Sequence, residues 1–89
     1  MKLNVVAKIR ITPEGVESDL EAIRERLVEL VGGFGKLHNS EVKPIAFGLN
    51  SIEATLLLND SKGGLEEIES SLKEMSEVSQ VDVLDVNLL

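Results

Sequence analysis

The stretch Pro44-Ile45-Ala46-Phe47-Gly48-Leu49 separates two strand-like runs and decides how the elements of this chain are joined. It is apolar, it is bracketed by Pro and Gly, and it holds one of the two Phe residues of an 89-residue chain. A hairpin tip is normally polar, because its backbone needs water and its side chains have no core to enter. Phe47 is therefore either a plug that folds back into the core or a probe for a partner. Taken alone, the loop favours the plug, since most large apolar side chains are buried.

Strand patterns flank this turn and occupy both ends of the chain. Residues 36–45 form a polar run with Pro44, which cannot donate to a sheet ladder and so belongs at a sheet edge or a strand end. Residues 4–12 and 52–58 alternate strictly, and residues 81–86 give a last strand. The two alternating runs are expected to supply the sheet side of the core through Val5, Ala7, Ile9, Ile11, Ile52, Ala54, Leu56 and Leu58.

Two helical patterns lie between these strands. Ser18-Asp19-Leu20-Glu21 predicts a capping box, in which the Ser18 hydroxyl and the Glu21 carboxylate each satisfy a free backbone N–H. Gly32-Gly33 ends this first helix, and a loop at residues 59–64 precedes the second. The apolar stripes are Leu20, Ile23, Leu27, Leu30 and Val31 in the first helix and Leu65, Ile68, Leu72 and Met75 in the second.

The resulting order, β-α-β-β-α-β, specifies an α+β, ferredoxin-like fold: a four-stranded antiparallel sheet with two helices on one face. Right-handed crossovers place the first and third strands centrally and the second and fourth at the edges. The open face is then expected to carry Lys8, Arg10, Glu53 and Thr55. Residues 1–89 are expected to form one domain.

The topology also assigns each connection between elements to one of the two ends of the domain, which we call poles. The Phe47 hairpin lies at one pole. The opposite pole is expected to hold the turn at residues 32–35, the loop with Lys62, and the C-terminal residues Asn87, Leu88 and Leu89.

Composition excludes several functions. The chain has no cysteine, so disulfides, thiolate metal sites and thiol nucleophiles are absent. Its formal net charge is −7 and its cations are scattered, whereas nucleic-acid binders need clustered cations. No apolar run approaches the ~20 residues of a membrane span. We therefore expect a cytoplasmic protein that binds neither nucleic acid nor membranes directly.

A search for catalytic chemistry returns little. His38 is the only histidine, and it lies on a polar edge strand without the partners of a triad. The glycines of residues 32–35 follow a helix, whereas a phosphate cradle precedes one. The carboxylate pairs Glu66-Glu67 and Asp82/Asp85 are expected to solvate a face or stabilise a helix start. We expect no active site of its own and no cofactor.

Three stretches of the sequence resemble a known protein family. The hairpin Pro-Ile-Ala-Phe-Gly-Leu (44–49), the loop Asn-Asp-Ser-Lys-Gly-Gly-Leu (59–65) and the ending Val-Ser-Gln-Val-Asp-Val-Leu-Asp-Val-Asn-Leu-Leu (78–89) resemble the archaeal elongation factor 1-beta family. The resemblance covers essentially the whole chain. It implies a guanine-nucleotide exchange factor that promotes GDP release from the GTPase that carries aminoacyl-tRNA in translation.

The same resemblance implies which residues meet the partner. The hairpin, with Pro44, Ile45, Phe47 and Gly48, wedges against one domain of the GDP-bound GTPase. In the family a basic side chain near the C-terminus reaches the Mg²⁺ site, but here Leu88, beside Asn87, stands at that position. Either Leu88 and Leu89 disturb the ion sterically, or a cation from the same pole substitutes, with Lys62 and Lys2 as candidates.

Two other classes share the fold. One is a small-molecule-binding regulatory or protein-interaction module; the other is an RNA-binding domain that uses sheet aromatics, which this sheet lacks. Fold alone does not choose between them. The apolar hairpin tip favours the exchange factor, because a regulatory ligand domain does not need it. The free protein is expected to be monomeric.

Overall fold

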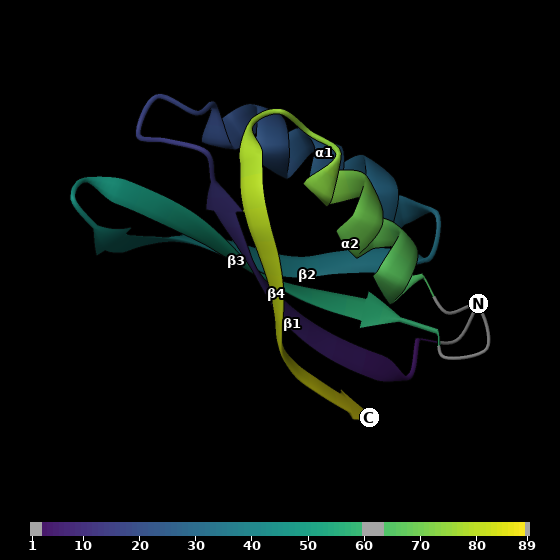
Figure 1. The fold of residues 1–89 in the computed structure, drawn as a ribbon. Helices are drawn as coiled ribbons and strands as arrows, with labels where there is room; N and C mark the ends of the chain where they lie inside the picture. Colours follow the sequence, from purple (N-terminus) through teal and green to yellow (C-terminus); the bar gives the residue numbers. More distant parts are fainter. Residues whose placement is uncertain (1–2, 60–63, 89) are drawn as a thin grey trace.

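The computed structural model describes residues 3–59 and 64–88. Within them the elements follow the predicted order: β1 (Val5–Pro13), α1 (Leu20–Gly32), β2 (Gly35–Ala46), β3 (Leu49–Leu58), α2 (Leu65–Lys73) and β4 (Val78–Leu88). The strands form one antiparallel sheet in the order β2-β3-β1-β4, and both helices lie on one face of it (Figure 1). The predicted ferredoxin-like arrangement is confirmed, with the Pro44-containing strand at an edge.

The core lies between the sheet and the two helices. Every second residue of β1 and of the inner part of β3 is buried, as the alternation predicts, because successive side chains of a strand point to opposite faces. The helices bury one stripe each. The fully buried large side chains include Ile9, Ile11, Ile23, Leu27, Val31, Ile52, Leu56, Ile68 and Leu72.

The predicted capping box at the start of α1 is wrong by one residue. The N-cap is Asp19, whose Oδ1 accepts a hydrogen bond from the Ala22 backbone N–H at 3.1 Å. The Ser18 hydroxyl instead accepts from the Gly15 N–H at 3.2 Å, because the chain turns at Gly15 just before the helix. Glu21 forms a 3.6 Å ion pair with Arg24 on the surface of α1. The helix therefore starts later than the Ser–Glu spacing suggested.

β4 is longer than the predicted residues 81–86. It pairs with β1 over nearly the whole length of that strand, from Val78 opposite Pro13 to Leu88 opposite Val5. A register shift near Lys8 leaves Leu84 without a partner in this ladder. The outer residues of β4 escape a pattern-based prediction because they do not alternate: Val78 is buried, but the residues at 79–80 and 87–88 are all exposed.

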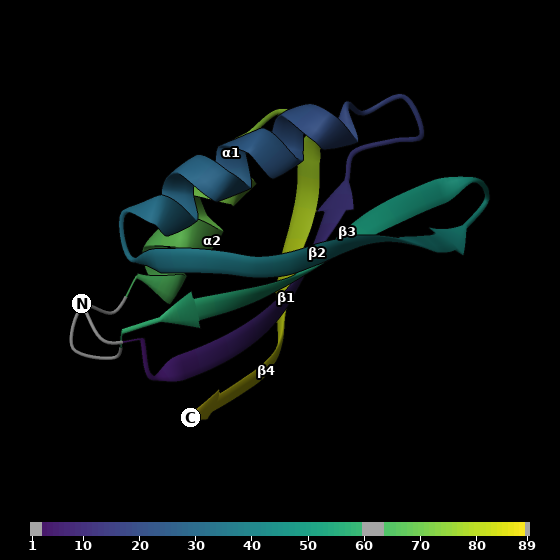
Figure 2. The same cartoon turned by 180° about the vertical axis from the view of Figure 1, so that it is seen from behind.

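The molecule is elongated, with extents of 39 × 20 × 16 Å among the described residues. One end is the β2–β3 hairpin, which projects from the helix-covered body, and the other contains the C-terminal end of β4 (Figure 2). The two expected poles are therefore confirmed for the described residues. Neither helix in the described ranges has the length and apolarity needed to span a bilayer.

Candidate partner-binding site

The hairpin of β2 and β3 continues past the rest of the sheet as a two-stranded arm, residues 43–51. β1 pairs with β3 only as far as Ile11 opposite Ile52, whereas β2 and β3 remain paired up to Ala46 opposite Leu49. At the base of the arm Ser51 is buried, and its hydroxyl donates to the Lys43 carbonyl at 3.4 Å. The arm is thus an extension of a well-packed sheet rather than a loose loop (Figure 1).

Phe47 and Gly48 form the tip of the arm. Both have positive φ angles, 53° and 78°, which is the pattern of the two-residue type I′ turn that suits hairpin twist. A bulky residue rarely adopts φ > 0, and within the described residues Phe47 is the only non-glycine that does. Such strain is typical of functional sites.

The Phe47 side chain is fully exposed, at 102% of its reference area. The interpretation of Phe47 as a core plug is therefore wrong. The physical reason is the length of the arm, because the packed core ends near the Ile11–Ile52 pair and the ring lies well beyond it. A solvated Phe ring held by a strained backbone is what a probe for a partner requires.

Pro44 and Ile45 lie just before the tip. Pro44 faces Asn50 across the arm, and a register shift between Pro44 and Ala46 leaves Ile45 as a bulged residue. Bulges bend a strand and redirect its side chains. Pro44 is exposed and Ile45 is half-exposed. The structure thus brings the predicted residues Pro44, Ile45, Phe47 and Gly48 together on one apolar tip.

The opposite pole is marked by a row of residues that crosses the sheet: Gly35, Leu58, Val5 and Leu88. Leu88 is 73% exposed, and the Asn87 side-chain amide donates to Asp85 Oδ2 at 2.9 Å. The predicted residues Lys62 and Leu89, and the alternative Lys2, lie outside the described residues. The structure therefore places Asn87 and Leu88 at this pole, far along the sheet from Phe47.

A pocket of about 310 Å³ lies beside this row. Its walls combine apolar residues of three strands and α2 with two carboxylates at the start of α2: Val5, Leu58, Leu65, Val86, Glu66 and Glu67, together with Asn59 and Gly64. The pocket contains no pair of groups arranged for acid–base or nucleophilic chemistry among these lining residues.

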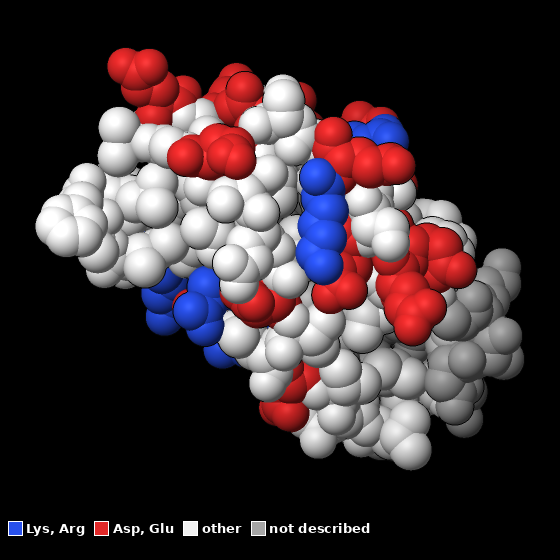
Figure 3. Space-filling view, viewed as in Figure 1, with Lys and Arg blue, Asp and Glu red and all other residues white. Residues whose placement is uncertain are grey.

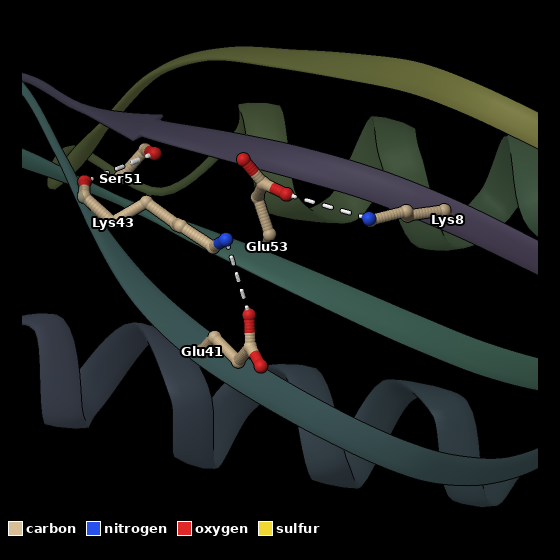
Figure 4. A network of polar contacts seen from close by, with 5 residues as sticks. All are labelled: Lys8, Glu41, Lys43, Ser51 and Glu53. Carbon is tan, nitrogen blue, oxygen red and sulfur yellow. Dashed lines mark hydrogen bonds and ion pairs between the residues drawn. The ribbon is translucent and has the colours of Figure 1, made fainter.

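The open face of the sheet carries a polar network (Figure 4). Lys8 forms a 3.7 Å ion pair with Glu53 on the neighbouring strand, and Lys43 forms a 3.4 Å ion pair with Glu41. These ion pairs offset the repulsion between the carboxylates of Glu41 and Glu53, which lie directly opposite each other on neighbouring strands. His38 is exposed on β2. Over the described ranges no group of three or more His, Cys, Asp or Glu could hold a metal ion.

Sequence reasoning missed one residue at the hairpin pole. Val16, in the loop between β1 and α1, is 65% exposed, and its Cγ1 atom lies 3.8 Å from the position that a Cβ atom on Gly48 would take. A signal was present, because Val16 is an apolar residue within the polar segment from Glu14 to Ser18, just as Phe47 is apolar at a turn.

Charge is unevenly distributed around the apolar tip. Seen as in Figure 1, the hairpin end of the surface is mostly uncharged, with acidic atoms along its upper side and basic atoms below (Figure 3). An apolar centre surrounded by charge is the usual composition of a protein-binding patch. The fold and this tip together define a small ferredoxin-like module with an exposed apolar projection at one end.

Comparison with known proteins specifies the module further. A family model described as the EF-1 guanine nucleotide exchange domain matches residues 6–89. The chain therefore belongs to this family, and it is a guanine-nucleotide exchange domain of the elongation factor type. The resemblance found in the sequence motifs is confirmed.

Curated relatives agree. The chain is 40% identical over 84 residues to elongation factor 1-beta of Methanosarcina barkeri, covering 93% of this chain and 94% of the relative. It is 37% identical over 86 residues to elongation factor 1-beta of Methanothermobacter thermautotrophicus, covering 97% of both chains. A solved structure, the C-terminal domain of the MgtC protein from Mycobacterium tuberculosis, matches with a TM-score of 0.66 at 18% identity over 97% of this chain and 87% of that one. That likeness shows the fold alone.

Proposed function

We propose that this protein binds the GDP-loaded GTPase that carries aminoacyl-tRNA in translation and accelerates the release of GDP. Family membership supports nucleotide exchange, and the exposed Phe47 at a strained turn supports a partner site at the hairpin tip. This second observation carries the proposal, because a fully solvated aromatic ring has no role in the stability of the free protein.

Exchange of this kind needs no catalytic residue. A GTPase holds GDP through its phosphate loop and a Mg²⁺ that offsets the phosphate charge. A partner that binds the nucleotide-free conformation more tightly lowers nucleotide affinity by its differential binding energy, and the coupling is reciprocal. We accordingly propose that the chain has no active site of its own and uses no cofactor.

The elongated shape supports contact at both poles. In this proposal Phe47, with Pro44, Ile45 and Gly48, wedges against one domain of the GTPase. Asn87, Leu88 and Leu89 approach the nucleotide and Mg²⁺ site of another domain. The length of about 39 Å is compatible with one module bridging two domains.

The C-terminal pole works without a basic residue at position 88. Leu88 is exposed and can displace neighbouring groups sterically, but it cannot displace Mg²⁺ by charge. We propose that Lys62, which precedes α2 in the sequence, supplies the cation. A charge aimed at a metal–phosphate site acts at short range in a partly dry interface, where it is worth a few kcal/mol.

Residues 1–89 act as a single exchange domain in this proposal, in the cytoplasm and as a monomer when free. The acidic net charge of −7 argues against direct contact with nucleic acid. The partner is a protein, in its GDP-bound state at first encounter.

The direct test is the release of fluorescently labelled GDP from the elongation factor GTPase of the same organism. Release should accelerate as this protein is added and should saturate at a rate well above the spontaneous one. An unchanged release rate at micromolar concentrations of both proteins would overturn the proposal.

A further inference from the structure

We infer that the loop between β1 and α1 forms, together with the Phe47 tip, one two-part docking surface for the GTPase, with Val16 as its second apolar contact. This inference rests on the proposed function and adds a surface to it. The partner is expected to offer an apolar pocket for the Phe47 ring with basic side chains beside it, on the side that faces the β1–α1 loop.

The two parts of the surface are neighbours in space although about thirty residues separate them. The Cγ1 atom of Val16 lies 3.8 Å from the position that a Cβ atom on Gly48 would take, so the Val16 side chain lies beside the tip. Val16 and Phe47 are both mostly solvent-exposed. The β1–α1 loop and the β2–β3 hairpin lie at the same end of the molecule in both views (Figures 1 and 2). A partner that encloses the Phe47 ring therefore meets Val16 as well.

The β1–α1 loop is held in a defined conformation. Gly15 and Ser18 close a turn around Val16 and Glu17, since the Ser18 N–H donates to the Gly15 carbonyl at 3.1 Å and the Ser18 hydroxyl accepts from the Gly15 N–H. Glu77 ties both ends of this turn to the start of β4. Its carbonyl accepts from the Glu14 N–H at 2.9 Å, and its Oε2 atom accepts from the Asp19 N–H at 2.7 Å.

This anchoring matters for binding. A loop whose conformation is fixed before association loses less entropy when it binds. Glu77 is therefore a positioning residue for Val16. The two hydrogen bonds to Glu77 hold the loop, and with it Val16, in the position in which the partner meets it.

The charge of the loop specifies the chemistry of the partner. Glu14 and Glu17 flank Val16 and are exposed, and residues 14–19 contain no Lys or Arg. Like charges across an interface are strongly unfavourable, so the facing surface must be neutral or basic. A basic surface also attracts the loop, so the partner that we infer has an apolar pocket with Lys or Arg at its rim.

The test measures GDP release as a function of exchange-factor concentration for Val16→Asp and Glu17→Lys. Each should raise the half-saturating concentration by about tenfold, by losing an apolar contact or by repelling a basic rim, with the maximal rate unchanged. The Glu17→Lys effect should shrink at high salt. Matched controls are Val28→Asp and Glu25→Lys, at exposed positions on α1, which should match the wild-type curve.

The role of Glu77 has its own readout. Glu77→Ala should raise the half-saturating concentration, and Glu77→Gln should restore it, because the amide oxygen can still accept from the Asp19 N–H. Denaturant melts confirm that each variant is folded.

The outcomes separate this inference from the proposed function. If Phe47→Ala shifts the curve but Val16→Asp and Glu17→Lys do not, the docking surface ends at the hairpin and the inference is wrong. If wild-type protein does not accelerate GDP release at all, the proposed function fails and this inference fails with it.

Discussion

The Phe34 ring packs directly onto Gly64, so closely that a Cβ atom on Gly64 would overlap the ring. Gly64 is also the N-cap of α2 and has a φ angle of 103°, a conformation that side-chain-bearing residues rarely adopt. This contact joins the turn after α1 to the start of α2 at the C-terminal pole. It explains why Phe34 is part of the fold whereas Phe47 is not.

Gly64→Ala should therefore lower the free energy of unfolding by about 2 kcal/mol or more, from backbone strain and the clash with Phe34. Urea denaturation measures the change. Gly32→Ala is the control, because Gly32 is the last residue of α1 and has open space around its Cα. It should be neutral or slightly stabilising. Equal stabilities of the two variants would contradict the contact.

The N-cap of α1 gives a second prediction. Asp19→Ala should cost about 1 kcal/mol of stability, because it removes the acceptor for the Ala22 N–H. Glu21→Ala should cost less, since Glu21 makes an exposed ion pair rather than a cap. If thermal or urea melts showed the larger loss for Glu21→Ala, the capping-box interpretation would have to be reinstated.

The C-terminal pole gives a third prediction, which concerns how exchange is driven there. Lys62→Ala should slow GDP release and leave the free energy of unfolding within about 0.5 kcal/mol, because in this proposal Lys62 acts on the partner and not on the fold. Deleting Leu88-Leu89 tests the steric alternative in the same release assay. Loss of exchange on deletion, with Lys62→Ala fully active, would show that no charge substitution takes place.

The regular part of the fold could be predicted because its patterns are local. The alternation in β1 and β3 and the three- and four-residue spacing in the helices each report one buried face. Ser18 and Asp19 could not be told apart, because the choice of cap depends on Gly15 beside them and on Glu77, which is 58 residues from Asp19.

The site was only half predictable for a related reason. Whether Phe47 is a plug or a probe depends on how far the arm extends past β1. The length of the arm cannot be predicted from the sequence, because exposed strand ends lack the alternation of apolar and polar residues. The position of Val16 beside Gly48 is created only when the chain folds. The family motifs identified the hairpin, but its exposure and its neighbour come from the tertiary structure.

The central claim is that Phe47 acts on the partner and not on the fold. Phe47→Ala should leave stability nearly unchanged, and Phe47→Asn should be neutral or stabilising by up to about 1 kcal/mol, because Asn tolerates the left-handed backbone that Phe47 strains. A plug would instead cost roughly 3–5 kcal/mol on truncation. Urea melts of the three proteins make this comparison.

The most direct measurement combines those melts with the rate of labelled GDP release from the elongation factor GTPase at a fixed, sub-saturating concentration of each variant. We predict that neither Phe47→Ala nor Phe47→Asn is appreciably less stable than the wild type, and that both are at least about tenfold slower in promoting release, the loss expected when a buried aromatic contact is removed from an interface. Full exchange activity in a stable Phe47→Ala protein would contradict the account.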